Sequence, residues 1–459
     1  MSNPRKVLSV FSLVMINVIA VDSLRTLPIS AALGFPLVFF YIPAALLFFI
    51  PIGLVAAELA TTYPQTGGIY IWVREAFGLR AGFTTIWLQW IYNVVWYPTI
   101  MAFIAATIAY LFNPELANNK YYLLISSIGL FWLFTVLNCY GMRVSSLIST
   151  LGALVGTLFP MLSIIILGFF WLWSGHIDLE SIRFNAWIPH YEDWSTAALF
   201  PGVLFGLIGL EMSAVHAEEV RNPQRDYPRA IAYSTLLIFL SLVLSSLAIV
   251  LVIPADHLSI ISGLIDAFKT FFNAFGLDWM LPILVVLIIL GALSGVAAWI
   301  IGPTKGLMVA AKDGSLPAIF SKMNQHHAPT FILFIQGIIF TLLTSVFVFS
   351  DSVNAAYWLL SDLCSQLALL VYIFMFAAAI KLRYSQPHRS GSYKIPGGNS
   401  VLWLLSISGI ICCLFAMAVG FIPPAQLDIK NTLFFECFLI GGLILFCVIL
   451  PWVFSRIKL

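Results

Sequence analysis

Two apolar stretches of this chain carry charged and helix-breaking residues where a membrane-spanning helix should be continuous. Residues 18–28 include Asp22 and Arg25 and end on a proline, and residues 205–211 include two glycines and end on Glu211. A helix that crosses hydrocarbon must satisfy its backbone N–H and C=O groups internally, so an interruption survives only beside a polar cavity or a ligand. The two interruptions therefore predict a binding site.

The backbone of two broken helices could bind a zwitterion. The half after each break presents unpaired N–H groups and a positive dipole end, and the half before it presents unpaired carbonyl groups. One pole suits a carboxylate and the other an ammonium group, so an α-amino acid fits both. We expect the carboxylate near Ser23 and Leu24, and the ammonium group near the carbonyl groups of Ile19, Gly206 and Leu207.

The charged side chains of the first break have two interpretations. Asp22 and Arg25 are three residues apart, so they could neutralise each other across one helical turn. Alternatively, because an intramembrane charge is costly, Asp22 could bind a substrate ammonium group or a proton, and Arg25 a distal carboxylate. Under the second interpretation Arg25 would favour an acidic substrate and Asp22 a basic one.

Aromatic and small residues could complete the pocket, although ordinary packing and lipid-facing roles compete for each aromatic residue. The candidates are Phe205 and Gly209 at the second break, Trp96 and Tyr97, Trp299, and Trp358.

Three further groups could bind a proton or sense pH. His216 lies just over one turn beyond Glu211, and Asp362 lies among strongly apolar neighbours. For Glu211 and His216 a hydrogen-bonded structural role is the alternative.

Composition places these residues in a membrane protein. The chain is 61% hydrophobic and only 9% charged, whereas a globular domain carries roughly a quarter charged residues. The basic residues lie in short loops between apolar stretches, which argues against a nucleic-acid partner. The six cysteines lack the spacing of a metal site, and the chain contains no phosphate loop or catalytic serine motif. We therefore expect neither a cofactor nor an enzyme.

The apolar stretches predict an all-α protein with twelve transmembrane helices, each about 20 residues or longer. Basic residues concentrate in alternate loops, which places both termini in the cytoplasm. The predicted spans are residues 7–30, 36–60, 81–112, 121–141, 145–174, 196–220, 230–253, 280–307, 330–349, 353–381, 401–421 and 432–454.

The interrupted spans are the first and the sixth, and each opens a set of five. Because five is odd, the two sets enter the membrane from opposite sides, which is the geometry of an inverted repeat with its site on the pseudo-two-fold axis. The sequence therefore predicts a first repeat at residues 1–175, a second at 176–385, and two further spans at 386–459.

Several motifs at the ends of these spans occur together. The motifs are Ala57-Glu58-Leu59-Ala60, Tyr63-Pro64-Gln65-Thr66-Gly67-Gly68, Glu218-Glu219-Val220-Arg221-Asn222-Pro223, Lys312-Asp313-Gly314 and Ile395-Pro396-Gly397-Gly398. With these motifs the chain resembles the amino acid, polyamine and organocation (APC) superfamily of transporters, which have a LeuT-like fold, and most closely its bacterial glutamate/GABA antiporters.

The resemblance implies sodium-independent exchange of an amino acid for another amino acid, or for its decarboxylated amine, across the bacterial inner membrane. In such relatives spans 1, 2, 6 and 7 rock against the others, Glu211 matches a glutamate associated with pH response, and Phe205 matches an aromatic gate. The alternatives are a basic amino acid or polyamine exchanger, a proton-coupled symporter, and an amino acid sensor. We expect a small-molecule substrate and the bilayer as partners, and a monomer or homodimer.

Overall fold

The computed structural model describes residues 8–65, 67–140, 152, 154–176, 184–189, 194–211, 220–326, 328–389, 391–427 and 429–456. Within these ranges the regular elements are all helices. One isolated β-bridge pairs Leu8 with Val220. The main helices are α1 (Val10–Val21), α2 (Leu27–Ala31), α3 (Leu37–Ala44), α4 (Ile50–Thr62), α5 (Ile69–Phe77), α6 (Leu79–Ala109), α7 (Lys120–Cys139), α9 (Phe159–Trp173), α10 (Trp194–Ala197), α11 (Phe200–Phe205), α12 (Pro223–Val252), α13 (Gly263–Phe275), α14 (Leu281–Lys312), α15 (Thr330–Thr344), α16 (Val346–Phe349), α17 (Val353–Ser385), α18 (Gly398–Gly420), α19 (Thr432–Ile444) and α20 (Leu450–Arg456).

Short 3-10 and π turns connect or continue these helices. The π turns lengthen spans, as between α3 and α4, before α9, and between α19 and α20. The elements are η1 (Leu24–Thr26), η2 (Ala45–Phe49), η3 (Pro114–Asn118), η4 (Leu154–Leu158), η6 (Phe184–Trp187), η8 (Ala255–His257), η9 (Asp278–Met280), η10 (Ala318–Ser321) and η11 (Leu445–Ile449).

The described helices include 10 that are long and apolar enough to cross a membrane, or 11 if the bent pair at the N-terminal end is one span. The remaining predicted span is residues 196–220. Its first half is the short apolar helix Trp194–Phe205, and residues 212–219 lie outside the described residues. The all-α membrane architecture is therefore confirmed, whereas a count of twelve spans stays a prediction.

The first span bends where the sequence changes its backbone preference. Helix α1 ends at Val21, and Asp22 and Ser23 both have extended backbones, with ψ of 121° and 122°. Pro28 has no N–H to donate to a carbonyl group one turn earlier, so it fits only the start of α2. The two halves of the span meet at an angle of 48°.

The second interruption lies against the first. Helix α11 ends at Phe205, and the backbone continues as turns until Gly209, where φ is +127°. A Cβ atom on Gly209 would lie 2.8 Å from the carbonyl oxygen of Ala20 in α1. Glycine thus permits both the backbone conformation and the close approach of the two breaks.

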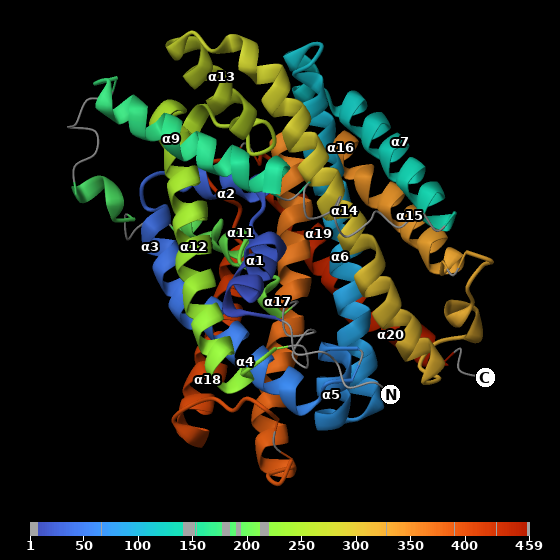
Figure 1. Ribbon diagram of the computed structural model, residues 1–459. Helices are drawn as coiled ribbons and strands as arrows, with labels where there is room; N and C mark the ends of the chain where they lie inside the picture. Colours follow the sequence, from blue (N-terminus) through green and yellow to red (C-terminus); the bar gives the residue numbers. More distant parts are fainter. Residues whose placement is uncertain are drawn as a thin grey trace.

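Long helices surround the two breaks. Figure 1 shows α6, α12, α14 and α17 running through the bundle with α1 between them, α13 at its upper end and α5 at its lower end. Helix α6 packs against both α14 and α17, and α12 packs against α1. These helices supply the walls on which side chains of the breaks can be held.

Beyond the bundle, residues 391–397 precede α18 and lie against the ends of α4 and α12. The Tyr393 N–H donates to Thr61 Oγ1 at 3.3 Å, and the Thr61 hydroxyl donates to the Tyr393 carbonyl oxygen at 3.2 Å. Gln224 bonds both the N–H and the C=O of Lys394, at 2.8 and 2.9 Å. We call residues 391–397 the strap, because they join spans that are distant in sequence.

An ion pair reinforces the strap. Arg383 near the end of α17 donates through Nε to Glu58 Oε1 of α4 at 2.8 Å, and its Nη2 lies 2.5 Å from Oε2. Glu58 Oε2 also accepts from the Ile395 N–H of the strap, at 2.8 Å. The two charged side chains are 7% and 15% exposed. Glu58 therefore holds α17 and the strap to α4.

Reversing one charge of this pair is expected to destabilise the protein. Glu58→Arg or Arg383→Glu places two like charges together and should lower the free energy of unfolding by about 2 kcal/mol. The double variant should recover part of this loss, but not all of it, because an arginine at position 58 cannot accept from Ile395 N–H. Thermal unfolding of the purified protein measures the effect, and single variants as stable as the parent would contradict it.

Candidate functional site

A cavity of about 390 Å³ lies at the two interruptions. Its walls come from the first break, from Tyr92, Asn93 and Trp96 of α6, from the second break, and from η4 and α14. Among the residues predicted from the sequence, it is lined by Ile19, Asp22, Ser23, Leu24, Arg25, Trp96, Phe205, Gly206 and Trp299. The cavity therefore lies at the two breaks, between helices that are distant in sequence.

Asp22 is held on the α12 side of the cavity. Both of its carboxylate oxygens accept from the Ser241 hydroxyl of α12, each at 3.1 Å. Its side chain is buried, and its N–H donates to the Val18 carbonyl oxygen at the end of α1. The carboxylate therefore has one neutral partner among the described residues and keeps accepting capacity toward the cavity.

Arg25 is held on the opposite side. Its Nη1 donates to Thr99 Oγ1 of α6 at 3.2 Å and to Ser361 Oγ of α17 at 3.4 Å, while Nε has no partner in the described ranges. The guanidinium carbon lies 5.4 Å from the ring centre of Phe205 and 5.9 Å from that of Tyr357, which are cation–π contacts. The side chain is only 1% exposed.

Asp22 and Arg25 do not pair with each other. The described part of the chain contains no ion pair for either residue, and each is hydrogen-bonded to hydroxyl groups of a different helix. Mutual neutralisation, one of the two interpretations from the sequence, is therefore absent from this conformation. An acidic and a basic side chain therefore face one cavity, and neither has a charged partner among the described residues.

The backbone at the first break also has unused groups. Within the described residues, the N–H groups of Ser23 and Leu24 have no acceptor and the carbonyl group of Ile19 has no donor. The Ser23 carbonyl oxygen accepts from the Thr26 N–H and hydroxyl, at 3.3 and 2.9 Å. The break therefore offers donors and an acceptor within a few residues.

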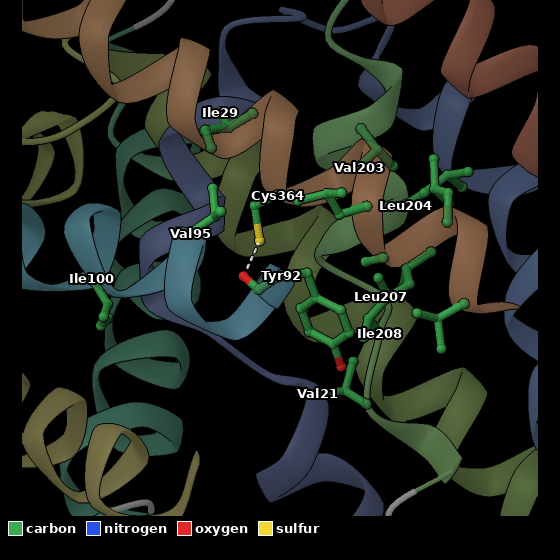
Figure 2. Close-up of a cluster of buried hydrophobic side chains, with 14 of the residues drawn as sticks. Val21, Ile29, Tyr92, Val95, Ile100, Val203, Leu204, Leu207, Ile208 and Cys364 are labelled. Atoms are coloured by element: carbon green, nitrogen blue, oxygen red, sulfur yellow. Dashed lines mark hydrogen bonds between the residues drawn. The ribbon is translucent and has the colours of Figure 1, made fainter. Parts of the chain in front are cut away.

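The second break contributes an apolar edge with one carboxylate nearby. Figure 2 shows the Tyr92 ring beside Val21 and Ile208, with the Cys364 thiol donating to the Tyr92 carbonyl oxygen at 3.1 Å. Leu207 and Gly209 are buried and do not line the cavity.

Glu211 ends the described part of this segment and is 4% exposed. Neither of its carboxylate oxygens has a hydrogen-bond partner among the described residues. The phenol groups of Tyr92 and Tyr372 lie near the Glu211 carboxylate. His216 falls in residues 212–219, outside the described residues.

The aromatic candidates divide according to helix face. Trp96 and Trp299 line the cavity with ring centres 6.4 Å apart. Tyr97, adjacent in sequence, does not line the cavity. Its ring packs against Phe131 with the ring centres 5.1 Å apart and the planes tilted by 44°, and its hydroxyl donates to the Trp299 carbonyl oxygen at 3.2 Å. Trp358 is fully buried and packs beside α11, outside the cavity lining.

Sequence reasoning missed the residues that position the charges. Thr99, Ser241 and Ser361 are small hydroxyl residues inside long apolar helices, where they resemble ordinary helix residues. The same holds for Ser234, which accepts from Asn17 at 2.9 Å and fixes α1 against α12. The only available signal was a polar residue within an apolar span, which many helices share.

The chain is similar in sequence to known transporters. A sequence model of a family described as amino acid permease matches residues 6–443. An uncharacterized transporter of Legionella pneumophila is 64% identical over 456 residues, covering 99% of this chain and 98% of that protein.

More distant relatives have named activities. A glutamate/gamma-aminobutyrate antiporter of Lactococcus lactis is 30% identical, covering 98% of this chain and 90% of the relative. A probable agmatine/putrescine antiporter of the same species is 26% identical, covering 99% and 96%.

Proposed function

Because this chain belongs to the amino acid permease family, we propose that it is a secondary transporter that exchanges amino acids across the bacterial inner membrane by alternating access. The supporting observation is that an acidic side chain, Asp22, and a basic one, Arg25, face one cavity without forming an ion pair with each other. A buried charge without a charged partner is unfavourable unless a ligand provides one.

The geometry favours a substrate with an ammonium group near one end and a carboxylate at the other. Asp22 and the Ile19 carbonyl group would bind the ammonium group, and Arg25 the distal carboxylate. The free N–H groups of Ser23 and Leu24 would bind an α-carboxylate. An acidic amino acid such as glutamate supplies all three groups.

The decarboxylated product of such a substrate would keep two of these contacts. Loss of the α-carboxylate from glutamate yields γ-aminobutyrate, which retains the ammonium group and the distal carboxylate. γ-Aminobutyrate would thus bind Asp22 and Arg25 and leave the N–H groups of Ser23 and Leu24 without an acceptor. This chemistry supports exchange of an acidic amino acid for its own decarboxylated amine, the activity named for the Lactococcus lactis relative.

The proposed architecture follows the family's transport cycle. It consists of twelve spans with cytoplasmic termini, in a LeuT-like arrangement of inverted repeats at residues 1–175 and 176–385 followed by residues 386–459. Spans 1, 2, 6 and 7 would move against the rest, with exchange independent of sodium. The bend of 48° at the first break supports a jointed first span.

A basic amino acid or polyamine is the second candidate substrate. Asp22 would bind its distal cation, and a relative is a probable agmatine/putrescine antiporter. Arg25 argues against this candidate, because a second cation would lie near an uncompensated guanidinium group.

Counterflow in proteoliposomes tests the proposal. Vesicles loaded with unlabelled glutamate should accumulate labelled glutamate, and external γ-aminobutyrate should compete better than arginine, agmatine or putrescine.

Asp22→Asn should weaken binding of every ammonium-bearing substrate by roughly tenfold, since the loss of one charged contact is worth about 1.4 kcal/mol. Glu115→Gln, at an exposed position of η3, is the matched control. Stronger competition by putrescine would favour the second candidate, and binding without counterflow would indicate a sensor.

A further inference from the structure

Helix α17 buries a second carboxylate that the cavity does not use. Asp362 is 0% exposed, and neither of its oxygens has a hydrogen-bond partner in the described ranges. Gln366, one turn further along α17, is also fully buried. Its Nε2 donates to the Met417 carbonyl oxygen of α18 at 3.1 Å, whereas its Oε1 has no donor. Two polar side chains with unused acceptors therefore share one buried location.

The walls around this pair come from α18 and α11. A Cβ atom on Gly420, at the end of α18, would clash with Gln366 Nε2 and would lie 2.9 Å from Asp362 Oδ1. It would also lie 3.0 Å from Pro201 of α11. Asp362 is thus enclosed by a glycine of α18 and by α11, the helix that precedes the second break.

The same side of α17 contacts α11 one turn before Asp362. A Cβ atom on Gly202 would lie 3.0 Å from the Trp358 ring. Ser361 faces differently, since its hydroxyl accepts from Arg25. One stripe of α17, Trp358 and Asp362, therefore faces α11, while the neighbouring position holds the charge of the first break.

None of the elements packed on this part of α17 contributes a cation to Asp362. Helix α11 contains no titratable residue. Arg25 of the first break donates to Thr99 and Ser361 instead. The other titratable side chains of the packed elements are Arg80, Tyr92 and Tyr97 of α6, Cys412 and Cys413 of α18, and Glu436 and Cys437 of α19. Arg80, the cation among them, is exposed at the first turn of α6. Helices α4 and α5 bring their charged residues, among them Glu58 with Arg383, to the far end of α17.

An ionised carboxylate in this position would have no counter-ion among the described residues, and Gln366 is the polar side chain beside it. Such a charge costs several kcal/mol in an apolar interior, so Asp362 keeps its proton while α11 and α18 enclose it. Ionisation requires water, and water requires that one of the enclosing helices withdraw.

We propose that Asp362 is a proton-binding site whose occupancy is linked to the seating of α11 on α17. This inference rests on the proposed transport function, because the movement of α11 is part of alternating access. Acid pH favours the seated state, and by linkage the withdrawal of α11 promotes release of the proton. The site couples pH to the transport cycle without touching the substrate.

The test measures counterflow at pH values from about 5 to about 8, a range above the ordinary pKa of a carboxyl group. The exchange rate of the parent protein should change by roughly tenfold across this range. That of Asp362→Asn should change by a clearly smaller factor, because its amide cannot titrate whereas Asp22 and Glu211 are the same in both proteins. Asp362→Glu should restore the pH dependence. Glu115→Gln serves again as the exposed control. An Asn variant with the parent's pH profile would overturn the proposal.

A second readout needs no transport. As the pH rises from about 5 to about 8, the thermal unfolding temperature of the purified parent should fall more than that of Asp362→Asn. The parent alone has a carboxyl group at position 362 that resists ionisation in the folded state, and the other buried carboxyl groups are common to both proteins. If the parent exchanges none of the tested substrates but this difference is present, the proposed function fails and the proton site stands.

If Asp362→Asn does not fold, Gln366→Leu replaces it. That change removes the polar side chain beside Asp362 and should shift the midpoint of the pH profile, so an unchanged midpoint would refute the site.

Discussion

Replacing Arg25 with glutamine is expected to lower the apparent affinity for substrates that carry a distal carboxylate by roughly a hundredfold. The guanidinium group is buried, faces the cavity and is held by hydroxyl groups of α6 and α17. Loss of a desolvated contact between this group and a carboxylate costs about 3 kcal/mol, or roughly a hundredfold in apparent affinity. Counterflow of labelled glutamate at several concentrations measures the loss as a rise in the half-saturating concentration.

Two further variants separate charge from geometry at this position. Arg25→Lys keeps the positive charge but removes the planar fork that contacts Thr99 and Ser361, so it should retain only part of the affinity. Arg80→Gln, at an exposed position of α6, should leave exchange unchanged. Glutamate affinity that survives Arg25→Gln would show that the guanidinium group is structural and that the substrate carboxylate binds elsewhere.

Replacing Gly209 with alanine is expected to stop exchange by disturbing the contact between the two breaks. Position 209 has φ of +127°, a conformation that costs a residue with a side chain about 1 to 3 kcal/mol. The added Cβ atom would also lie 2.8 Å from the carbonyl oxygen of Ala20, so one of the two backbones must shift. Because both segments line or adjoin the cavity, we expect the exchange rate to fall by at least roughly tenfold.

The control for this prediction is another glycine. A Cβ atom on Gly441 of α19 would meet no atom within 4 Å, and the residue has an ordinary helical backbone. Gly441→Ala should therefore retain full exchange. Size-exclusion elution and thermal unfolding distinguish a local effect at Gly209 from general misfolding. A Gly209→Ala protein that is folded and fully active would show that the breaks tolerate displacement.

The sequence predicted the helical architecture and the first break because these depend on local properties. Apolar stretches of sufficient length are visible in one dimension, and a proline after two charged residues marks where a helix must bend. The same reasoning placed Asp22 and Arg25 beside a cavity. It left open whether they neutralise each other, since three residues of separation permit either arrangement.

The sequence could not predict what settles that choice. Arg25 is held by residues that are 74 and 336 positions away, and Asp22 by one that is 219 positions away. Such contacts depend on how whole helices are rotated and placed. The same cause separates Trp96 from Tyr97, because neighbouring residues on a helix point about 100° apart and only one of them can face the cavity.

The strap has a consequence for tolerance to mutation. Its bonds to α4 and α12 use the peptide groups of Tyr393, Lys394 and Ile395, which every residue except proline supplies in full. The recognising side chains belong instead to the helices, at Glu58, Thr61 and Gln224. Substitutions at those three helical positions would therefore remove partners of the strap backbone. A substitution at the exposed Lys394, other than to proline, would leave these hydrogen bonds in place.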